Sequence, residues 1–206
     1  MTSVDFTLVS LTHEALRRDL LRMSAAIRAA AIQDVAVRNR WQTFCRQLRG
    51  YLSAAEVAFW PPLRTVLTDN ADLEIVDAMA AAQANIDPLV DSIDAALAFN
   101  DGAVAKAQLA TLTTLLTEHL DQVDRDILPL VARYLGPDGF AQYGRQCHRN
   151  PDRRAVMEFF PWVLDGAAPE QQREALAKMP RAARLAYQTV AKTMYTRTPR
   201  WSGTHS

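Results

Sequence analysis

The most regular feature of the chain is a series of long stretches in which apolar residues recur every three or four positions. Four such stretches cover about Asp5–Ala31, Asp34–Trp60, Asp72–Ala98 and Ala103–Tyr134. This spacing gathers apolar side chains on one face of an α-helix. Short connections join the stretches, as in antiparallel neighbouring helices. We therefore predict an all-α protein built as an up-down-up-down four-helix bundle.

The composition of the sequence changes after the fourth stretch. Shorter apolar runs follow, broken by glycine and proline, and aromatic residues become frequent. Phe159, Phe160, Trp162 and Leu164 are too apolar together to be left in water. We predict two parts: a four-helix bundle over residues 1–136, and a helical extension over residues 137–206 that packs on the bundle.

Composition and charge narrow the class of protein. The 206 residues are 49% hydrophobic with seven glycines, which is enough to bury a core. Residues 1–140 hold 12 Lys and Arg against 18 Asp and Glu, and residues 141–206 hold 11 against 5. We interpret this as a basic tail that packs on an acidic bundle. Because the basic residues form no tight cluster, we predict no nucleic-acid partner.

Neither the start of the chain nor its cysteines indicate export. Residues 1–11 lack a basic start followed by an apolar run, and no apolar run approaches the roughly 20 residues that span a bilayer. Cys45 and Cys147 are too few and too far apart for a disulfide framework, and no neighbours suggest zinc. We predict a cytoplasmic protein with no membrane partner.

Polar residues inside the apolar stripes are the candidates for chemistry. His119 and Asp124 lie in the apolar run of the fourth helix, and Glu56 lies in the middle of the stripe of the second, one turn beyond Leu52. His13 lies near the stripe of the first helix, where a single histidine is more often a core residue than a ligand. A carboxylate in such a stripe needs an ionic partner, a metal or a proton.

One sequence pattern occurs twice: an acidic residue, two residues, two large apolar residues and a proline. It runs from Glu56 to Leu63 and again from Asp124 to Val131. Together with His13 and His119, this order of residues along the helices resembles the hemerythrin-like, or HHE cation-binding, family over about residues 9–135. The stretch from Phe160 to Gly166 is similar to the extension found on actinobacterial members.

The resemblance implies a bundle core that holds two non-haem irons. Histidines from all four helices bind the metals in that family, and two carboxylates bridge them. Carried over by residue, His13 and His119 match terminal ligands, and Glu56 and Asp124 match the bridges. The family's histidines of the second and third helices correspond to Leu52 and Gln83 here. The resemblance therefore implies a degenerate metal site.

Leu52, Gln83 and Val123 are expected at the wall of a bundle cavity into which His13, Glu56, His119 and Asp124 converge. These four residues could bind one Fe(II), or they could form a metal-free polar cluster. We favour the metal-free reading, so that no cofactor is assigned and iron remains the alternative. Shared protons in such a cluster suit acid–base catalysis.

Three functions stay open at this point. The first is a small-molecule enzyme or binding protein that uses the polar cluster. The second is a mono- or di-iron protein that reacts with oxygen or peroxide, and the third is a non-catalytic sensor or binding module. The expected partner is a small-molecule ligand or substrate. Whether the protein is an enzyme, and its oligomeric state, stay open as well.

Overall fold

A computed structural model describes residues 4–29, 33–149, 153–178, 184 and 187 of the chain. The chain forms two compact units that interleave along the sequence. The first unit comprises Met1–Phe6 and Leu48–Pro151, and the second comprises Thr7–Gln47 and Asp152–Ser206. The predicted division into residues 1–136 and 137–206 stays a prediction.

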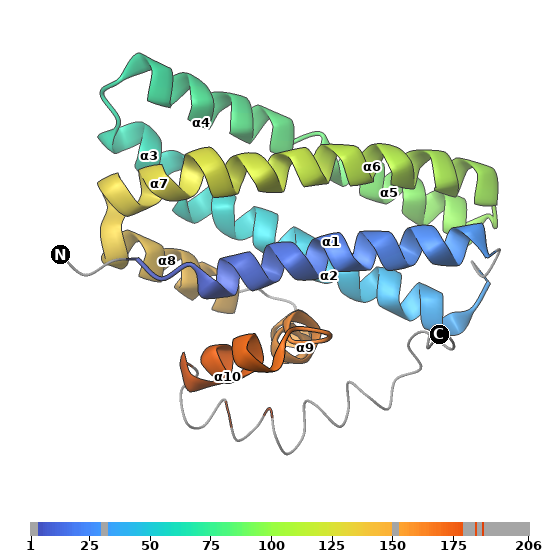
Figure 1. The fold of residues 1–206 in the computed structure, drawn as a ribbon. Coiled ribbons are helices and arrows are strands. Elements are labelled where there is room, and N and C mark those ends of the chain that lie inside the picture. The colour runs from blue at the N-terminus through green and yellow to red at the C-terminus, as the bar shows by residue number, and fades with distance from the viewer. Residues whose placement is uncertain (1–3, 30–32, 150–152, 179–183, 185–186, 188–206) are drawn as a thin grey trace. The chain divides into compact units, whose positions relative to one another are not determined.

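The first unit consists of helices and helical turns that follow one another closely along the chain. Its elements are the second half of α2 (Val35–Ala58), α3 (Trp60–Val66), α4 (Asn70–Gln83), α5 (Ile86–Ala98), α6 (Gly102–Gln122), the π-helical turn η1 (Val123–Ile127), α7 (Leu128–Leu130), a second π-helical turn η2 (Val131–Leu135) and α8 (Gly136–His148). Helices α5 and α6 lie side by side (Figure 1). Asp101 caps α6 by accepting a hydrogen bond from the Val104 N–H at 3.0 Å.

Proline explains where the predicted long helices are interrupted. Pro88 lies in the first turn of α5, where its ring would clash with the carbonyl of Ala84 in a continuous helix. The predicted third helix is accordingly two helices, α4 and α5, separated at Ala84 and Asn85. Pro61 and Pro62 have the same effect on the second helix, which gives way to α3 after Phe59.

The second copy of the acid-to-proline pattern gives a different backbone. Pro129 has no N–H to offer the carbonyl of Arg125. Instead of breaking, the helix widens, and the Leu128 N–H bonds to the Val123 carbonyl five residues earlier. A turn of this kind inserts one extra residue into the helical register. The buried positions nevertheless keep helical spacing from Leu120 through Val123 to Ile127.

The second unit joins the start of the chain to the extension. Its elements are α1 (Thr7–Arg28), the first half of α2, α9 (Arg153–Val163) and α10 (Pro169–Lys178). Helix α9 packs against α1 and buries Trp162, Val163 and Leu164, with Trp162 fully inaccessible. Complete burial of such side chains contributes about 1.5–3 kcal/mol each. The apolar end of α9 is thus part of a core.

A network of charged groups fixes the end of α9, and we call it the α9 anchor. Its members are Arg18, Asp19, Arg22, Arg40, Trp162 and Asp165. The Trp162 indole N–H donates to Asp19 Oδ2 at 2.8 Å, and Arg18 Nε donates to Asp19 Oδ1 at 3.1 Å. Arg22 and Arg40 bind the Asp165 carboxylate at 3.0 and 2.9 Å.

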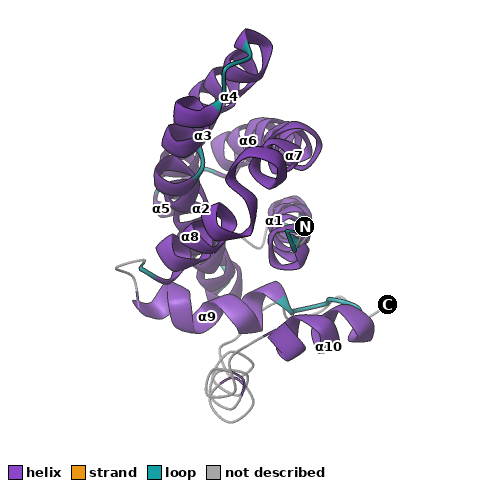
Figure 2. Ribbon diagram, turned by 90° about the vertical axis from the view of Figure 1, so that its left-hand side faces the viewer, coloured by secondary structure: helices purple, strands orange, loops and turns teal. Residues whose placement is uncertain are grey.

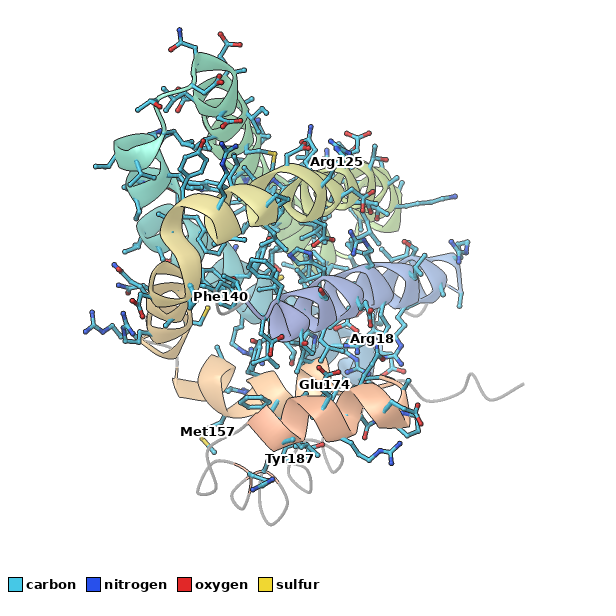
Figure 3. All side chains as sticks on the ribbon, turned by 60° about the vertical axis from the view of Figure 1, so that its left-hand side comes forward. Arg18, Arg125, Phe140, Met157, Glu174 and Tyr187 are labelled. Carbon is cyan, nitrogen blue, oxygen red and sulfur yellow. The ribbon has the colours of Figure 1, made fainter. Side chains whose placement is uncertain are left out.

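Arg18 also caps the end of helix α9. It donates to the main-chain oxygens of Trp162 and Asp165, and lies on the side of α1 that faces α10 (Figure 3). Burial would raise the pKa of Asp165, but Arg40, Arg18 and Arg22 together hold it below its ordinary value of 3.8. The anchor therefore stabilises the end of α9 with ionised partners.

The predicted all-α fold class, a helical bundle with a helical C-terminal extension, is confirmed. The part of the chain that the structure describes contains helices and loops but no strand (Figure 2). Among the same residues, no helix is both long enough and apolar enough to cross a lipid bilayer.

Candidate functional site

The residues predicted to form the site are divided between the two units. Glu56, His119, Asp124 and the predicted wall residues Leu52, Gln83 and Val123 belong to the first unit. His13 belongs to the second unit, where it is completely buried on α1. The convergence of His13 with the other three candidate residues stays a prediction.

Within the first unit, the structure brings Leu52, Glu56 and Gln83 together. The Gln83 side-chain Nε2 donates to Glu56 Oε1 at 2.8 Å and to the main-chain oxygen of Leu52 at 3.2 Å. Glu56 and Leu52 are one turn apart on α2, and Gln83 is the last residue of α4. The amide therefore joins α4 to α2 through two oxygen atoms.

Burial differs sharply among these three residues. The side chains of Leu52 and Gln83 are buried, with 4% and 5% of their surface accessible, whereas Glu56 is exposed. The other end of the amide, Gln83 Oε1, is inaccessible and has no hydrogen-bond partner among the described residues. In this pair, the Glu56 carboxylate is open to solvent, whereas the Gln83 amide oxygen is buried and accepts no hydrogen bond from the described residues.

His119 and Val123 are buried near the end of α6, with 2% of each accessible. Asp124, the next residue along η1, is exposed. Ordinary helical spacing explains this, because the buried positions pass from Leu120 to Val123 and then to Ile127, and Asp124 falls outside them. Helix α4 packs against both α6 and η1.

The expectation that Glu56 lies in the middle of the apolar stripe of the second helix is wrong, because its side chain is exposed. Asp124, expected on or beside the stripe of the fourth helix, lies beside it. Leu48, Leu52 and Ala55 are among the buried positions of α2, and Glu56 lies at their edge beside exposed Ser53 and Val57. Neither carboxylate needs a metal or a proton to compensate for burial, because water solvates both.

An acidic strip on α5, which sequence reasoning did not find, continues the site along α2. Arg49, one turn before Leu52, contacts Asp91 at 2.6 Å, Asp87 at 3.5 Å and Asp94 at 4.0 Å. The aspartates are spaced by four and three residues, which is a sequence signal for one helix face.

The donor atoms of this site do not fit an iron centre. The Leu52 side chain has no lone pair, and Gln83 turns its NH2 group, which is a donor only, toward Glu56. Iron in such bundles needs histidine nitrogens together with carboxylates. Within the described part of the chain, no three His, Cys, Asp or Glu side chains are grouped so that they could hold a metal ion.

The thiols of the described residues offer no ready nucleophile. Cys45 is buried, and burial raises the pKa of the Cys147 thiol to about 11, despite a hydrogen bond with Tyr143 that lowers it. Burial also raises the pKa of Tyr143, which stacks on Phe59 with ring centroids 4.3 Å apart. Both groups stay protonated near neutral pH and serve the packing of α8.

Comparison with known proteins gives one match. The family model described as the hemerythrin HHE cation-binding domain matches residues 5–131, which is more than half of the chain. No curated protein and no solved structure was found to match. The matched range ends at Val131 in η2, and so includes both acid-to-proline patterns.

Proposed function

Because the chain belongs to the hemerythrin HHE cation-binding domain family, we propose that it is a member in which the di-iron centre has been replaced by a metal-free polar site for a small molecule. The observation that carries this proposal is the 2.8 Å contact between Gln83 Nε2 and Glu56 Oε1. At a position where the family resemblance calls for a metal-binding histidine, this chain has an amide that donates to the carboxylate.

The chemistry of the site follows from the two groups in contact. A neutral amide donor satisfies one oxygen of Glu56 without adding charge, so the carboxylate keeps its capacity to accept further hydrogen bonds or a proton. Because Glu56 is exposed, a small molecule can reach it from solvent. Glu56 is the binding residue in this proposal and the candidate general base, while buried His119 and Val123 form part of the wall.

The proposal also includes the cellular compartment of the protein and the class of its binding partner. Neither Cys45 nor Cys147 is in a disulfide bond, as is typical of proteins that work in a reducing compartment. This supports the cytoplasm as the place of action. The proposed partner is a small molecule, with no role for nucleic acid or a membrane.

Iron loading tests the proposal. Wild-type protein, the single variants L52H and Q83H, and the double variant L52H/Q83H would be purified from iron-supplemented cells and reloaded anaerobically with Fe(II). We expect less than about one tenth of an equivalent of iron in the wild type, and a clear increase in the double variant because two imidazole donors are restored beside Glu56.

The matched control is Q47H, which places the same new side chain at another buried glutamine, more than two helical turns before Glu56 on α2. Equal iron in Q47H and L52H/Q83H would show that added histidine binds iron without regard to position. Stoichiometric iron in the wild type, with an absorption spectrum that changes in Glu56→Gln, would overturn the metal-free assignment.

A further inference from the structure

Two exposed helix faces of opposite charge each carry a large apolar side chain. Phe99 at the end of α5 is 86% exposed and Leu21 on α1 is 67% exposed, the highest values among the large hydrophobic side chains of the described residues. A single exposed apolar residue is common, so the residues around these two decide what they do. We propose that the two faces bind each other between two copies of the chain, which thereby associate head to tail.

The first face, which we call the α5 face, consists of Asp87, Asp91, Ala95, Ala98 and Phe99. These positions recur every three or four residues, so they lie along one side of α5. All five are exposed, while the buried residues of α5 lie on its other side. The α5 face thus has two carboxylates at one end, two small residues in the middle and an aromatic ring at the other end.

The backbone beside Phe99 is well fixed. Asn100 adopts a left-handed φ of 58°, and the Asp101 N–H donates to the Ala96 carbonyl at 2.8 Å, which closes the end of α5. The Asp101 side chain then accepts a hydrogen bond from the Val104 N–H at the start of α6. A partner that covers Phe99 therefore meets an ordered backbone, and little conformational entropy is lost there on binding.

The charge around the α5 face is negative. Residues 65–105 contain no Lys, Arg or His and eight acidic residues, Asp69, Asp72, Glu74, Asp77, Asp87, Asp91, Asp94 and Asp101. Arg49 contacts Asp87 at 3.5 Å and Asp91 at 2.6 Å, and its single charge neutralises only one of these two carboxylates. A partner that fits the α5 face therefore brings positive charge beside an apolar side chain.

The second face has this composition, and we call it the α1 face: Arg17, Leu21, Ala25 and Arg28. These residues are spaced by four, four and three positions along one side of α1. Leu21, Ala25 and Arg28 are exposed. Residues 15–33 contain four arginines and one acidic residue, Asp19, which is buried. Arg28 has no ionic partner among the described residues.

The spacing within the two faces matches when the helices run antiparallel. If Leu21 packs on the two alanines of the α5 face, Arg28 lies about 10 Å further along α1, at 1.5 Å per residue. By the same rise, Asp91 and Asp87 lie about 8 and 14 Å from the middle of the two alanines along α5. The Arg28 guanidinium can therefore pair with either carboxylate, and the small alanines let the two helices approach closely.

The contact has two consequences that can be measured. Because the two faces differ, each copy offers one of each, and the association is heterologous rather than two-fold symmetric. Two helix faces bury less surface than a stable dimer interface, so the association is weak, and its exposed charges make it sensitive to salt. Neither face includes Glu56, so the outcome is independent of the proposed function.

Sedimentation equilibrium of the full chain tests the association. We expect the average mass of the wild type to rise as its concentration approaches about 1 mM, since interfaces of this size are weak. Phe99→Ser and Leu21→Ser should each weaken the association by roughly tenfold or more, because each removes a large apolar side chain from the contact. Met157→Ser, which alters another exposed apolar residue, is the matched control and should have no effect. A wild type that stays monomeric, or an equal effect of Met157→Ser, would overturn the proposal.

Mixing the two variants tests which faces are in contact. Phe99→Ser keeps the α1 face and Leu21→Ser keeps the α5 face, so an equimolar mixture should form pairs that stop at two chains. Each variant alone should remain monomeric at the same concentration. If the mixture associates no more than the separate variants, or if only one of the two substitutions weakens the wild-type association, the two faces do not bind each other.

Charge reversal gives a second test that keeps both apolar side chains. Arg28→Glu and Asp91→Arg should each weaken the association, and the double variant R28E/D91R should recover most of it, because the opposite charges meet again. A double variant that is weaker than either single variant would contradict the pairing of the two faces.

Discussion

The α9 anchor and the Glu56–Gln83 pair each contain a carboxylate, but the two carboxylates differ in burial and in the number of donors that they accept. Asp19 is buried, with 2% accessible, and receives donors from Arg18 and Trp162. Glu56 is exposed and receives one amide donor, whose own oxygen has no partner among the described residues. A buried carboxylate that accepts hydrogen bonds through both oxygens stabilises a fold, whereas one exposed to solvent is available to a ligand.

The largest expected effect is on the anchor. Asp19→Ala would leave the Trp162 indole and the Arg18 guanidinium without their buried acceptor, so we expect unfolding free energy to fall by about 3–5 kcal/mol. Urea unfolding monitored by circular dichroism measures this change. The control is Asp77→Ala, which breaks the exposed 2.7 Å pair with Arg64 and should cost less than about 1 kcal/mol. Similar losses of unfolding free energy in Asp19→Ala and Asp77→Ala would contradict the stated difference between a buried and an exposed carboxylate.

The anchor also predicts a dependence on pH. The folded pKa of Asp165 is lowered, so its ionisation stabilises the protein at pH values above the ordinary 3.8. This contribution is lost as the pH falls below 3.8 and through the folded pKa. We expect wild-type stability to fall more steeply than that of Asp165→Asn between pH 4 and 2. Parallel curves for the two proteins would show that the three arginines do not act through this carboxylate.

A smaller effect is expected from removing the amide at the site. Gln83→Leu removes a buried amide oxygen that has no hydrogen-bond partner among the described residues, together with a donor to a solvated carboxylate. We therefore expect the unfolding free energy to change by no more than about 0.5 kcal/mol. Gln47→Leu is the matched control, because Gln47 is equally buried and donates to the Ala155 oxygen at 2.8 Å. Its loss should cost about 1 kcal/mol. A larger loss of stability in Gln83→Leu than in Gln47→Leu would show that Gln83 mainly stabilises the fold.

Helical periodicity predicted the fold class well, because that prediction rests on many apolar positions and a few exceptions do not change it. It failed where proline alters the backbone locally. Pro88 divides the predicted third helix, and Pro129 follows directly on a π-helical turn, η1. The two acid-to-proline patterns look alike in sequence, but one ends an α-helix and the other widens it.

The candidate site was predictable only in part. The family resemblance put Leu52 and Gln83 at the wall of a cavity that Glu56 enters; Gln83 does contact Glu56 and the Leu52 oxygen, and the cavity itself stays a prediction. The direction of the Gln83 amide was not predictable, because it depends on which acceptors α2 presents to the end of α4. The exposure of Glu56 also depends on how α4 packs, which spacing along α2 does not specify.

The central claim, that an amide rather than a metal holds Glu56, can be tested on the Gln83 side chain itself. In ¹⁵N-labelled wild-type protein, we expect the Gln83 NH2 signals to show slow hydrogen exchange that becomes fast in Glu56→Ala. Anaerobic addition of Fe(II), at the concentration that loads L52H/Q83H, should leave these signals sharp. Paramagnetic broadening of the Gln83 signals in the wild type would place iron at Glu56 and contradict the claim.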